Sequence, residues 1–177
     1  MSTGRSRFNI YLAGLLAAGL LAGCATDKEN PNHEVANLRV HVQAPAGAMF
    51  STKVPVFRVN PVMFTIEKEP FLTEQLVSGA RVVDVPGGFN LEIHFNRQGT
   101  WLLEEYTTTN PGKRLVIYSA FGDKDRKQSR WLGAPIISRR VDKGVISFAP
   151  DATRDEAELI ARGLELVAKQ NKDSNKW

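Results

Sequence analysis

Few side chains of this sequence have the type and spacing that catalysis or metal binding requires. The chain has one cysteine, Cys24, and three histidines, His33, His41 and His94. A single thiol cannot form a disulfide within the chain, and no two histidines stand at the H-x-x-x-H spacing of a zinc-binding helix. The G-x-S-x-G motif of serine hydrolases is also absent from the sequence. The sequence therefore predicts no catalytic constellation, no metal site, no cofactor and no small-molecule substrate.

A group of polar residues surrounds the turn at residues 110–112, Asn-Pro-Gly. Proline cannot continue a helix and glycine accepts a positive φ, so a helix over residues 98–108 is expected to end there. Hydroxyl groups such as that of Thr107 would then either face a ligand or belong to a helix end that frays into the turn. The candidate partner contacts around this turn are Thr107, Asn110, Lys113 and Arg114.

The N-terminal residues read as an export signal. Residues 10–23 carry no charge, and Arg5 and Arg7 precede them. A helix over this run would span only about 21 Å at about 1.5 Å per residue, whereas a bilayer core is about 30 Å thick. A cleaved signal peptide over residues 1–23 is therefore favoured over a transmembrane anchor.

The end of that signal, Leu-Ala-Gly-Cys at residues 21–24, resembles the lipobox of bacterial lipoproteins. The resemblance implies that the thiol of Cys24 is acylated and that cleavage leaves Cys24 as the first residue. The mature protein would then be a membrane-anchored lipoprotein of the cell envelope that faces the periplasm. Ala25 favours the outer membrane, because an aspartate there would suggest inner-membrane retention in some bacteria. Residues 24–37 would form the lipidated cysteine and a polar tether.

Charge argues against nucleic acid as a partner. The chain has 23 Lys and Arg against 19 Asp and Glu, a formal net charge of +4. This charge falls to +2 when Arg5 and Arg7 are removed with the signal. So small an excess is not the basic footprint of a nucleic-acid-binding domain.

The remaining pattern predicts one α+β domain over residues 38–169, followed by a polar tail at 170–177. We expect an antiparallel-rich sheet with two main helices packed on one face. Strands are expected at 38–42, 54–59, 62–66, 81–85, 89–95, 115–118 and 144–148. A short helix is expected at 70–76.

Two helices carry most of the expected packing. The helix at 98–108 should bury Trp101, Leu102 and Tyr106. The final helix, to about residue 169, should begin with a capping box made by Thr153 and Glu156, and its apolar residues should recur at 3.6-residue spacing. His41 and His94 fall on the polar phase of their strands and are expected on the surface.

From residue 70 onward the order of short motifs resembles the head subdomain of the first periplasmic domain of SecD/SecDF. The resemblance covers residues 70–168. The motifs that carry it are Pro-Phe-Leu-Thr at 70–73, Asn110-x-Gly112-Lys113-Arg114-Leu115, Gly-Ala-Pro-Ile-Ile at 133–137, Gly-Val-Ile-Ser at 144–147 and Thr153-x-x-Glu156-Ala157. The resemblance implies an α+β fold without cofactor or active site, in a region thought to engage the emerging preprotein. SecD also has several membrane helices, and no apolar run of that kind follows Gly23.

The leading hypothesis is a non-enzymatic envelope lipoprotein that binds extended polypeptide or an envelope protein partner, linked to protein export. A sheet edge near Pro55, or one beside residues 115–118, would add a peptide strand. The alternative is a purely structural lipoprotein of an envelope assembly. An enzyme is the third hypothesis.

Overall fold

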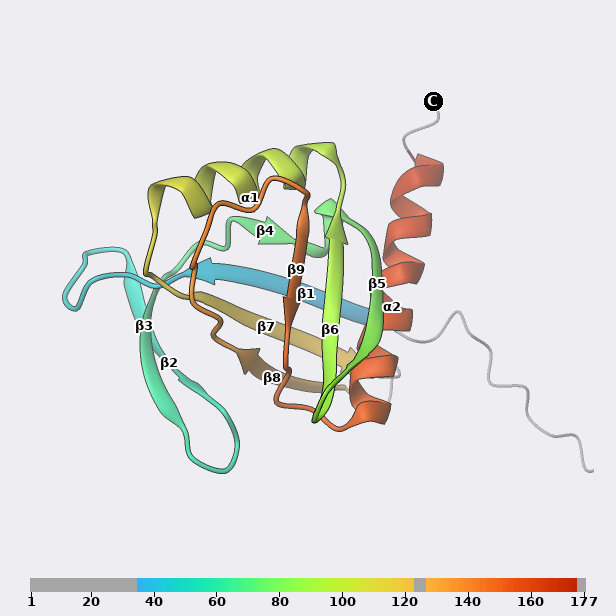
Figure 1. The fold of residues 1–177 in the computed structure, drawn as a ribbon, viewed down its shortest axis with the longest axis horizontal. Helices are drawn as coiled ribbons and strands as arrows, with labels where there is room; N and C mark the ends of the chain where they lie inside the picture. Colours follow the sequence, from blue (N-terminus) through green and yellow to red (C-terminus); the bar gives the residue numbers. More distant parts are fainter. Residues whose placement is uncertain (1–34, 123–126, 175–177) are drawn as a thin grey trace, which may run out of the picture. The chain divides into compact units, whose positions relative to one another are not determined.

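The computed structural model describes residues 35–122 and 127–174 (Figure 1). The predicted signal peptide, Cys24, His33 and most of the predicted tether lie outside the described residues, as does the end of the predicted tail from residue 175. The first strand begins at Val35, within the residues 24–37 that were expected to form the lipidated cysteine and the tether. Within the described part, no helix is both long and apolar enough to cross a bilayer.

The first sheet has four antiparallel strands in the order β4-β1-β7-β8. Its central pair is formed by β1 (Val35–Val42) and β7 (Leu115–Gly122), flanked by β4 (Leu72–Thr73) and β8 (Gln128–Gly133). Every second residue of β1 is buried on one face, in agreement with the alternation of its sequence.

The second sheet has three antiparallel strands in the order β5-β6-β9. The strands β5 (Val77–Val85) and β6 (Gly88–Phe95) form the hairpin that the sequence predicted. The turn between them places Pro86 before Gly87, whose φ is +87°. Glycine reaches such a φ without the steric cost of a Cβ, and the ring of Pro86 holds its own φ at about −65°. These are the conformations that the two central residues of a type II turn require. The edge strand β9 (Val145–Phe148) pairs with β6.

The two sheets share one hydrophobic core, which the helix α2 (Arg154–Ser174) covers at one side (Figure 1). The helix packs against β5 and β1, and also touches β7 and β6. Its fully buried side chains include Ala157, Ile160 and Leu164, as the 3.6-residue period predicted. The predicted capping box is present: Thr153 N–H donates to Glu156 Oε2 at 2.8 Å, and Glu156 N–H donates to Thr153 Oγ1 at 3.3 Å. The helix continues to Ser174, past Lys169.

The helix α1 (Arg97–Thr109) packs against β4 and β6 with a face that differs from the predicted one. Its buried residues are Gly99, Leu103 and Thr107, which lie four residues apart. Leu102 and Tyr106 are partly buried beside them, as expected, but Trp101 is 67% exposed. The prediction for Trp101 was wrong because Gly99, which has no side chain, faces the body: a Cβ there would lie 2.9 Å from that of Phe95.

A separate hairpin, β2 (Ser51–Val56) and β3 (Val62–Glu67), lies against the first sheet. Val54, Val56 and Ile66 pack there on Val116 of β7 in a second, smaller core. Because Leu115 and Ile117 point into the main core, β7 is buried on both faces. This explains the unbroken apolar run at residues 115–117.

The predicted α+β class with antiparallel strands and two main helices is confirmed. The strands are divided over three sheets, where the sequence pattern suggested one. Besides Trp101, two details of the prediction were wrong. The segment after Pro70 forms the two-residue β4 and a single 3-10 turn, Glu74–Leu76, instead of a helix opened by the proline. The edge expected beside residues 115–118 does not exist, because β1 and β8 pair with both sides of β7.

Candidate functional site

The four predicted contact residues all lie where α1 passes into β7. Thr107 is buried, and its hydroxyl is used inside the protein: Oγ1 donates to the Leu103 carbonyl at 2.7 Å and accepts from Val141 N–H at 2.9 Å. It therefore does not present its hydroxyl to solvent. Asn110 accepts a hydrogen bond from Lys113 Nζ on its Oδ1 at 2.6 Å.

These residues hold the segment at 134–137 in place. Arg114 donates from a guanidinium nitrogen to the Ala134 carbonyl at 2.6 Å and lies over the ring of Phe64. The backbone adds two bonds, from Gly112 N–H to the Ile137 carbonyl at 2.9 Å and from Ile137 N–H to the Lys113 carbonyl at 2.8 Å. Their visible role is to position one wall of a groove.

That groove has a volume of about 540 Å³ and lies between the segment at 135–143 and the strand β9. Its floor includes the buried residues Leu115, Ile137 and Ile146. Thr107 is the one predicted contact residue that lines it. The groove thus offers an apolar floor beside a sheet edge, which the residue pattern had not indicated.

Along this groove, successive residues of β9 point their backbone N–H and C=O groups alternately toward β6 and away from it. Phe95 N–H donates to the Gly144 carbonyl at 2.9 Å, so this pair is a hydrogen-bonded pair of the antiparallel ladder. The next pairs are His94 with Val145, Ile93 with Ile146, and Glu92 with Ser147. Since hydrogen-bonded and non-hydrogen-bonded pairs alternate, the N–H and C=O groups of Val145 and Ser147 point away from β6, toward the groove.

These outward groups are unsatisfied by protein. Within residues 35–122 and 127–174, no hydrogen bond reaches the backbone N–H or C=O of Val145 or Ser147. Exposed edge groups of this kind are a template for another strand. The neighbouring edges are less suitable: β5 lies under α2, and β2 contains Pro55, which has no N–H to donate.

Cations outnumber acids at the rim of the groove. Arg139, Lys143 and Asp142 are exposed, and Arg140 is paired with Glu104 of α1. Among the residues that the structure describes, no three His, Cys, Asp or Glu side chains come together in a way that could hold a metal ion. The rim of the groove is therefore basic, because Arg139 and Lys143 are exposed beside Asp142, the single acid among the described residues that line it.

His41 lies on the face of β1 that the hairpin β2–β3 covers, so the prediction of a surface histidine was wrong for this residue. It is 7% exposed, and its ring stands 5.5 Å from that of Trp131. Its Nδ1–H donates to the Glu67 carbonyl at 2.8 Å. Burial lowers the pKa of His41 from its ordinary value of 6.5, and the charge of Arg39 adds to this, whereas the Glu67 bond and the carboxylates of Glu69 and Glu67 oppose it.

We expect this histidine to make the protein less stable in mild acid. The unfolded chain takes up the His41 proton near pH 6.5, but the folded chain does so only at lower pH, so stability falls as the pH drops below 6.5. Urea midpoints from about pH 7.5 to about pH 5 should show the decrease. His41→Gln should flatten it, and an equal slope in that variant would assign the effect to another group.

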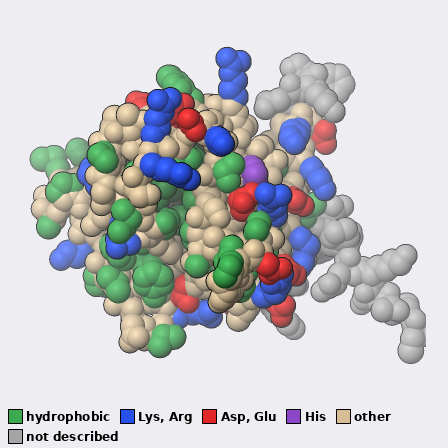
Figure 2. Space-filling view, in the orientation of Figure 1, with side chains coloured by type: hydrophobic (Ala, Val, Ile, Leu, Met, Phe, Trp, Pro, Cys, Tyr) green, Lys and Arg blue, Asp and Glu red, His purple; other side chains and the backbone are tan. Residues whose placement is uncertain are grey.

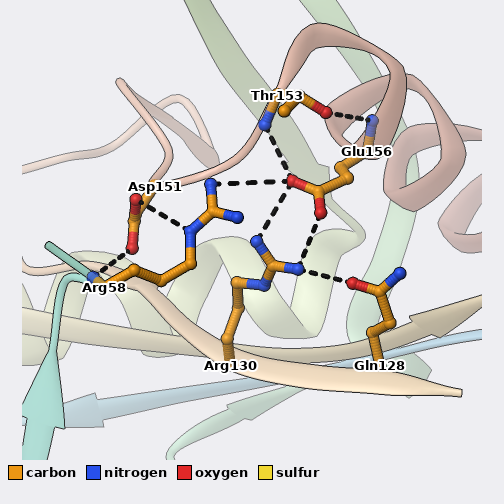
Figure 3. A network of polar contacts seen from close by, with 6 residues as sticks. All are labelled: Arg58, Gln128, Arg130, Asp151, Thr153 and Glu156. Atoms are coloured by element: carbon orange, nitrogen blue, oxygen red, sulfur yellow. Dashed lines mark hydrogen bonds and ion pairs between the residues drawn. The ribbon is translucent and has the colours of Figure 1, made fainter.

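A polar network ties the tip of the β2–β3 hairpin to the start of α2 (Figure 3). Arg130 of β8 binds both carboxylate oxygens of Glu156, at 3.1 and 2.7 Å, and Arg58 stands 3.8 Å from the same carboxylate. Burial by itself would raise the pKa of Glu156, but the bond from Thr153 and the two guanidinium groups keep it below its ordinary value. The Glu156 carboxylate therefore joins three segments: the hairpin tip through Arg58, β8 through Arg130 and the start of α2 through Thr153.

No protein-family model and no curated protein matches this sequence. Solved structures of SecDF do match it. A crystal structure of SecDF in a super-membrane-facing form aligns with a TM-score of 0.52 and 20% identity over 73% of this chain and 18% of that chain. A structure of SecDF, described as a membrane component that enhances protein export, aligns with a TM-score of 0.52 and 19% identity over 93% of this chain and 71% of that chain.

The chain thus spans less than a fifth of the first of these SecDF chains. At such low identity the matches concern the fold alone. They show that the described chain adopts a SecDF-like α+β fold, the one that the resemblance to the SecD/SecDF periplasmic head predicted.

Proposed function

We propose that this protein is a non-enzymatic lipoprotein of the cell envelope whose domain binds an extended polypeptide segment along β9. The observation that carries the proposal is the outward backbone of Val145 and Ser147, which lines a groove and has no partner in the described chain. A peptide paired with these groups would complete a fourth strand of the second sheet. Its alternate side chains would then meet the apolar floor formed by Leu115 and Ile137.

The same proposal places the domain on a membrane facing the periplasm, the outer membrane being favoured by Ala25. The lipid on Cys24 is the anchor, and the residues up to 34 are the tether. The similarity to SecDF, described as a component that enhances protein export, supports a polypeptide in transit as the ligand. An unfolded envelope protein is the ligand class that fits both the compartment and the groove.

A purely structural role in an envelope assembly is the second candidate. The observation that favours it is a pair of large apolar side chains, Met49 and Phe50, exposed in the loop between β1 and β2. Affinity purification from detergent-solubilised membranes separates the two functions. One stoichiometric partner would support assembly, whereas many substoichiometric clients would support binding of unfolded chains.

Proline at position 147 should weaken peptide binding without disturbing the pairing of β9 with β6. Ser147→Pro removes one outward N–H, and proline is tolerated on an edge strand whose N–H faces away from the sheet. Loss of one backbone hydrogen bond of about 1.4 kcal/mol corresponds to a roughly tenfold higher Kd. The measurement is fluorescence anisotropy with the strongest binder from an array of overlapping porin peptides.

Ser147→Ala is the matched control, because it keeps the backbone N–H and should bind as the wild type does. Circular dichroism should show equal thermal midpoints for the control and the wild type, and a folded spectrum for Ser147→Pro. N-methylation of the peptide backbone adds a test in which the protein is unchanged. Methylating the alternate amides that would face β9 should abolish binding, whereas methylating the amides in between, which would face away, should not. Equal Kd values for the two methylated peptides would rule out strand addition at β9.

A further inference from the structure

One end of the groove beside β9 is crossed by the chain itself. Residues 138–143, here called the arch, leave the wall of the groove after Ile137 and lead to Gly144 and the start of β9, and all of them line the groove. Figure 1 shows this connection passing α1 before it turns into β9. A strand laid along β9 therefore meets the arch at the start of β9.

The arch is fastened to the helix α1. Arg140 is ion-paired with Glu104, and Val141 N–H donates to Thr107 Oγ1 at 2.9 Å. At the end of the arch, Gly144 leaves no room for a Cβ, which would stand 2.0 Å from a threonine hydroxyl of α1. Residues three apart lie on one face of a helix, so α1 holds the arch in place along a single face.

Two cations of the arch are left without a partner. Arg139 and Lys143 are exposed, and in the part of the chain that the structure describes neither makes an ion pair or a side-chain hydrogen bond. The charge of Arg140 is met by Glu104, and Asp142 is the one acid among the described residues that line the groove. In the space-filling view, Lys and Arg side chains gather over this part of the molecule, at the upper left (Figure 2). This end of the groove therefore favours a negative charge on a ligand.

The direction of a bound strand decides which of its ends meets the arch. The strands of the second sheet pair antiparallel, and a ligand that continues this pattern has its C-terminus at the start of β9. If its last residue lies opposite Val145, one carboxylate oxygen accepts the outward Val145 N–H and the other is left for the cations of the arch. A parallel strand would instead bring its N-terminal ammonium to Arg139 and Lys143, which would repel it.

We propose that the groove selects the C-terminal end of an extended polypeptide, whose terminal carboxylate is bound by Arg139, Lys143 and the N–H of Val145. This inference rests on the proposed function, since it takes a strand paired with β9 as given. It adds the direction of that strand and the part of the ligand that is bound. Backbone pairing gives affinity for many sequences, and charge-assisted bonds to the carboxylate distinguish a chain end from an internal segment.

The test compares C-terminal acids with C-terminal amides of the same peptide. The strongest binder among the porin peptides is shortened from its C-terminus one residue at a time, and each length is made in both forms with a fluorophore on its N-terminus. Anisotropy with the full-length protein in detergent should show at least one length whose acid binds several-fold more tightly than its amide. The difference should shrink as the salt concentration rises.

Charge reversal in the arch should have an effect that a structural defect would not produce. Lys143→Glu should reverse the preference, so that the amide binds more tightly than the acid, and combining Arg139→Gln with Lys143→Gln should make the two forms bind equally. Lys169→Gln, at an exposed position of α2, is the matched control and should keep the wild-type preference. Ser147→Pro should weaken acid and amide by the same factor, and it thus tests the pairing with β9 separately.

Three results would overturn this inference and leave peptide binding at β9 intact. The first is equal binding of acid and amide at every length by the wild type. The second is a preference for the acid that persists in the double glutamine variant, which would place the chain end away from the arch. The third is an internal aspartate in an amidated peptide that raises affinity as much as the free terminus does. If no peptide of either form bound, the proposed function itself would fail.

Discussion

Replacing Leu164 with alanine should lower the free energy of unfolding by about 2–5 kcal/mol. The side chain is 0% exposed and lies in the core shared by both sheets, on the face of α2 that packs against β5 and β1. Truncation removes buried apolar area and leaves a cavity that β-sheet walls cannot collapse to fill. Urea denaturation followed by circular dichroism gives the difference directly.

Glu165→Ala is the control for that variant. Its side chain is exposed on the next position of the same helix, so the expected change is within about 0.5 kcal/mol. If Leu164→Ala left the urea midpoint where the control leaves it, α2 would have to present another face to the sheets.

Replacing Cys24 with alanine should abolish lipidation completely. The thiol is the acyl acceptor that the lipobox resemblance assigns, and no second cysteine could substitute for it. Acyl chains contribute about 0.8 kcal/mol per buried methylene, and stable anchoring takes more than one chain. The wild type should therefore incorporate labelled palmitate and resist a salt wash of the membranes, while the variant incorporates none.

The mass of the mature N-terminus completes that experiment. Wild type should begin at a modified Cys24, whereas Cys24→Ala should keep the uncleaved signal. Gly23→Ala is the control, because it preserves a small residue before the cut. Thermal unfolding of the Cys24→Ala variant should match that of the wild type, because the described core begins at Ala36. An unmodified N-terminus upstream of Cys24 in the wild type would remove both the anchor and the proposed location.

The sequence by itself determined the elements whose signals are local. Thr153 and Glu156 predicted the start of α2 because a capping box needs only two side chains three residues apart. The hairpin of β5 and β6 followed from Pro86-Gly87 between two β-rich runs. The α+β class followed from the number and type of such elements, and the SecDF-like fold from their motifs in order.

The tertiary structure alone decided which surfaces remain open. His41 and Trp101 were each assigned to the wrong side, because the exposure of a residue depends on whether another segment covers its face. The hairpin β2–β3 covers His41, whereas no segment of the described chain buries Trp101. Periodicity shows that a strand or helix has two faces, but not which of them finds a partner.

The proposed binding site, like the exposure of His41 and Trp101, could be found only from the tertiary structure. Val145 and Ser147 carry no chemical signal in the sequence, because every residue other than proline has the backbone groups that they offer. They became a candidate site when strand order placed β9 at an edge and the contacts of Arg114 and Thr107 held the facing wall in place. Strand order results from long-range packing of the whole core, which no short stretch of sequence specifies.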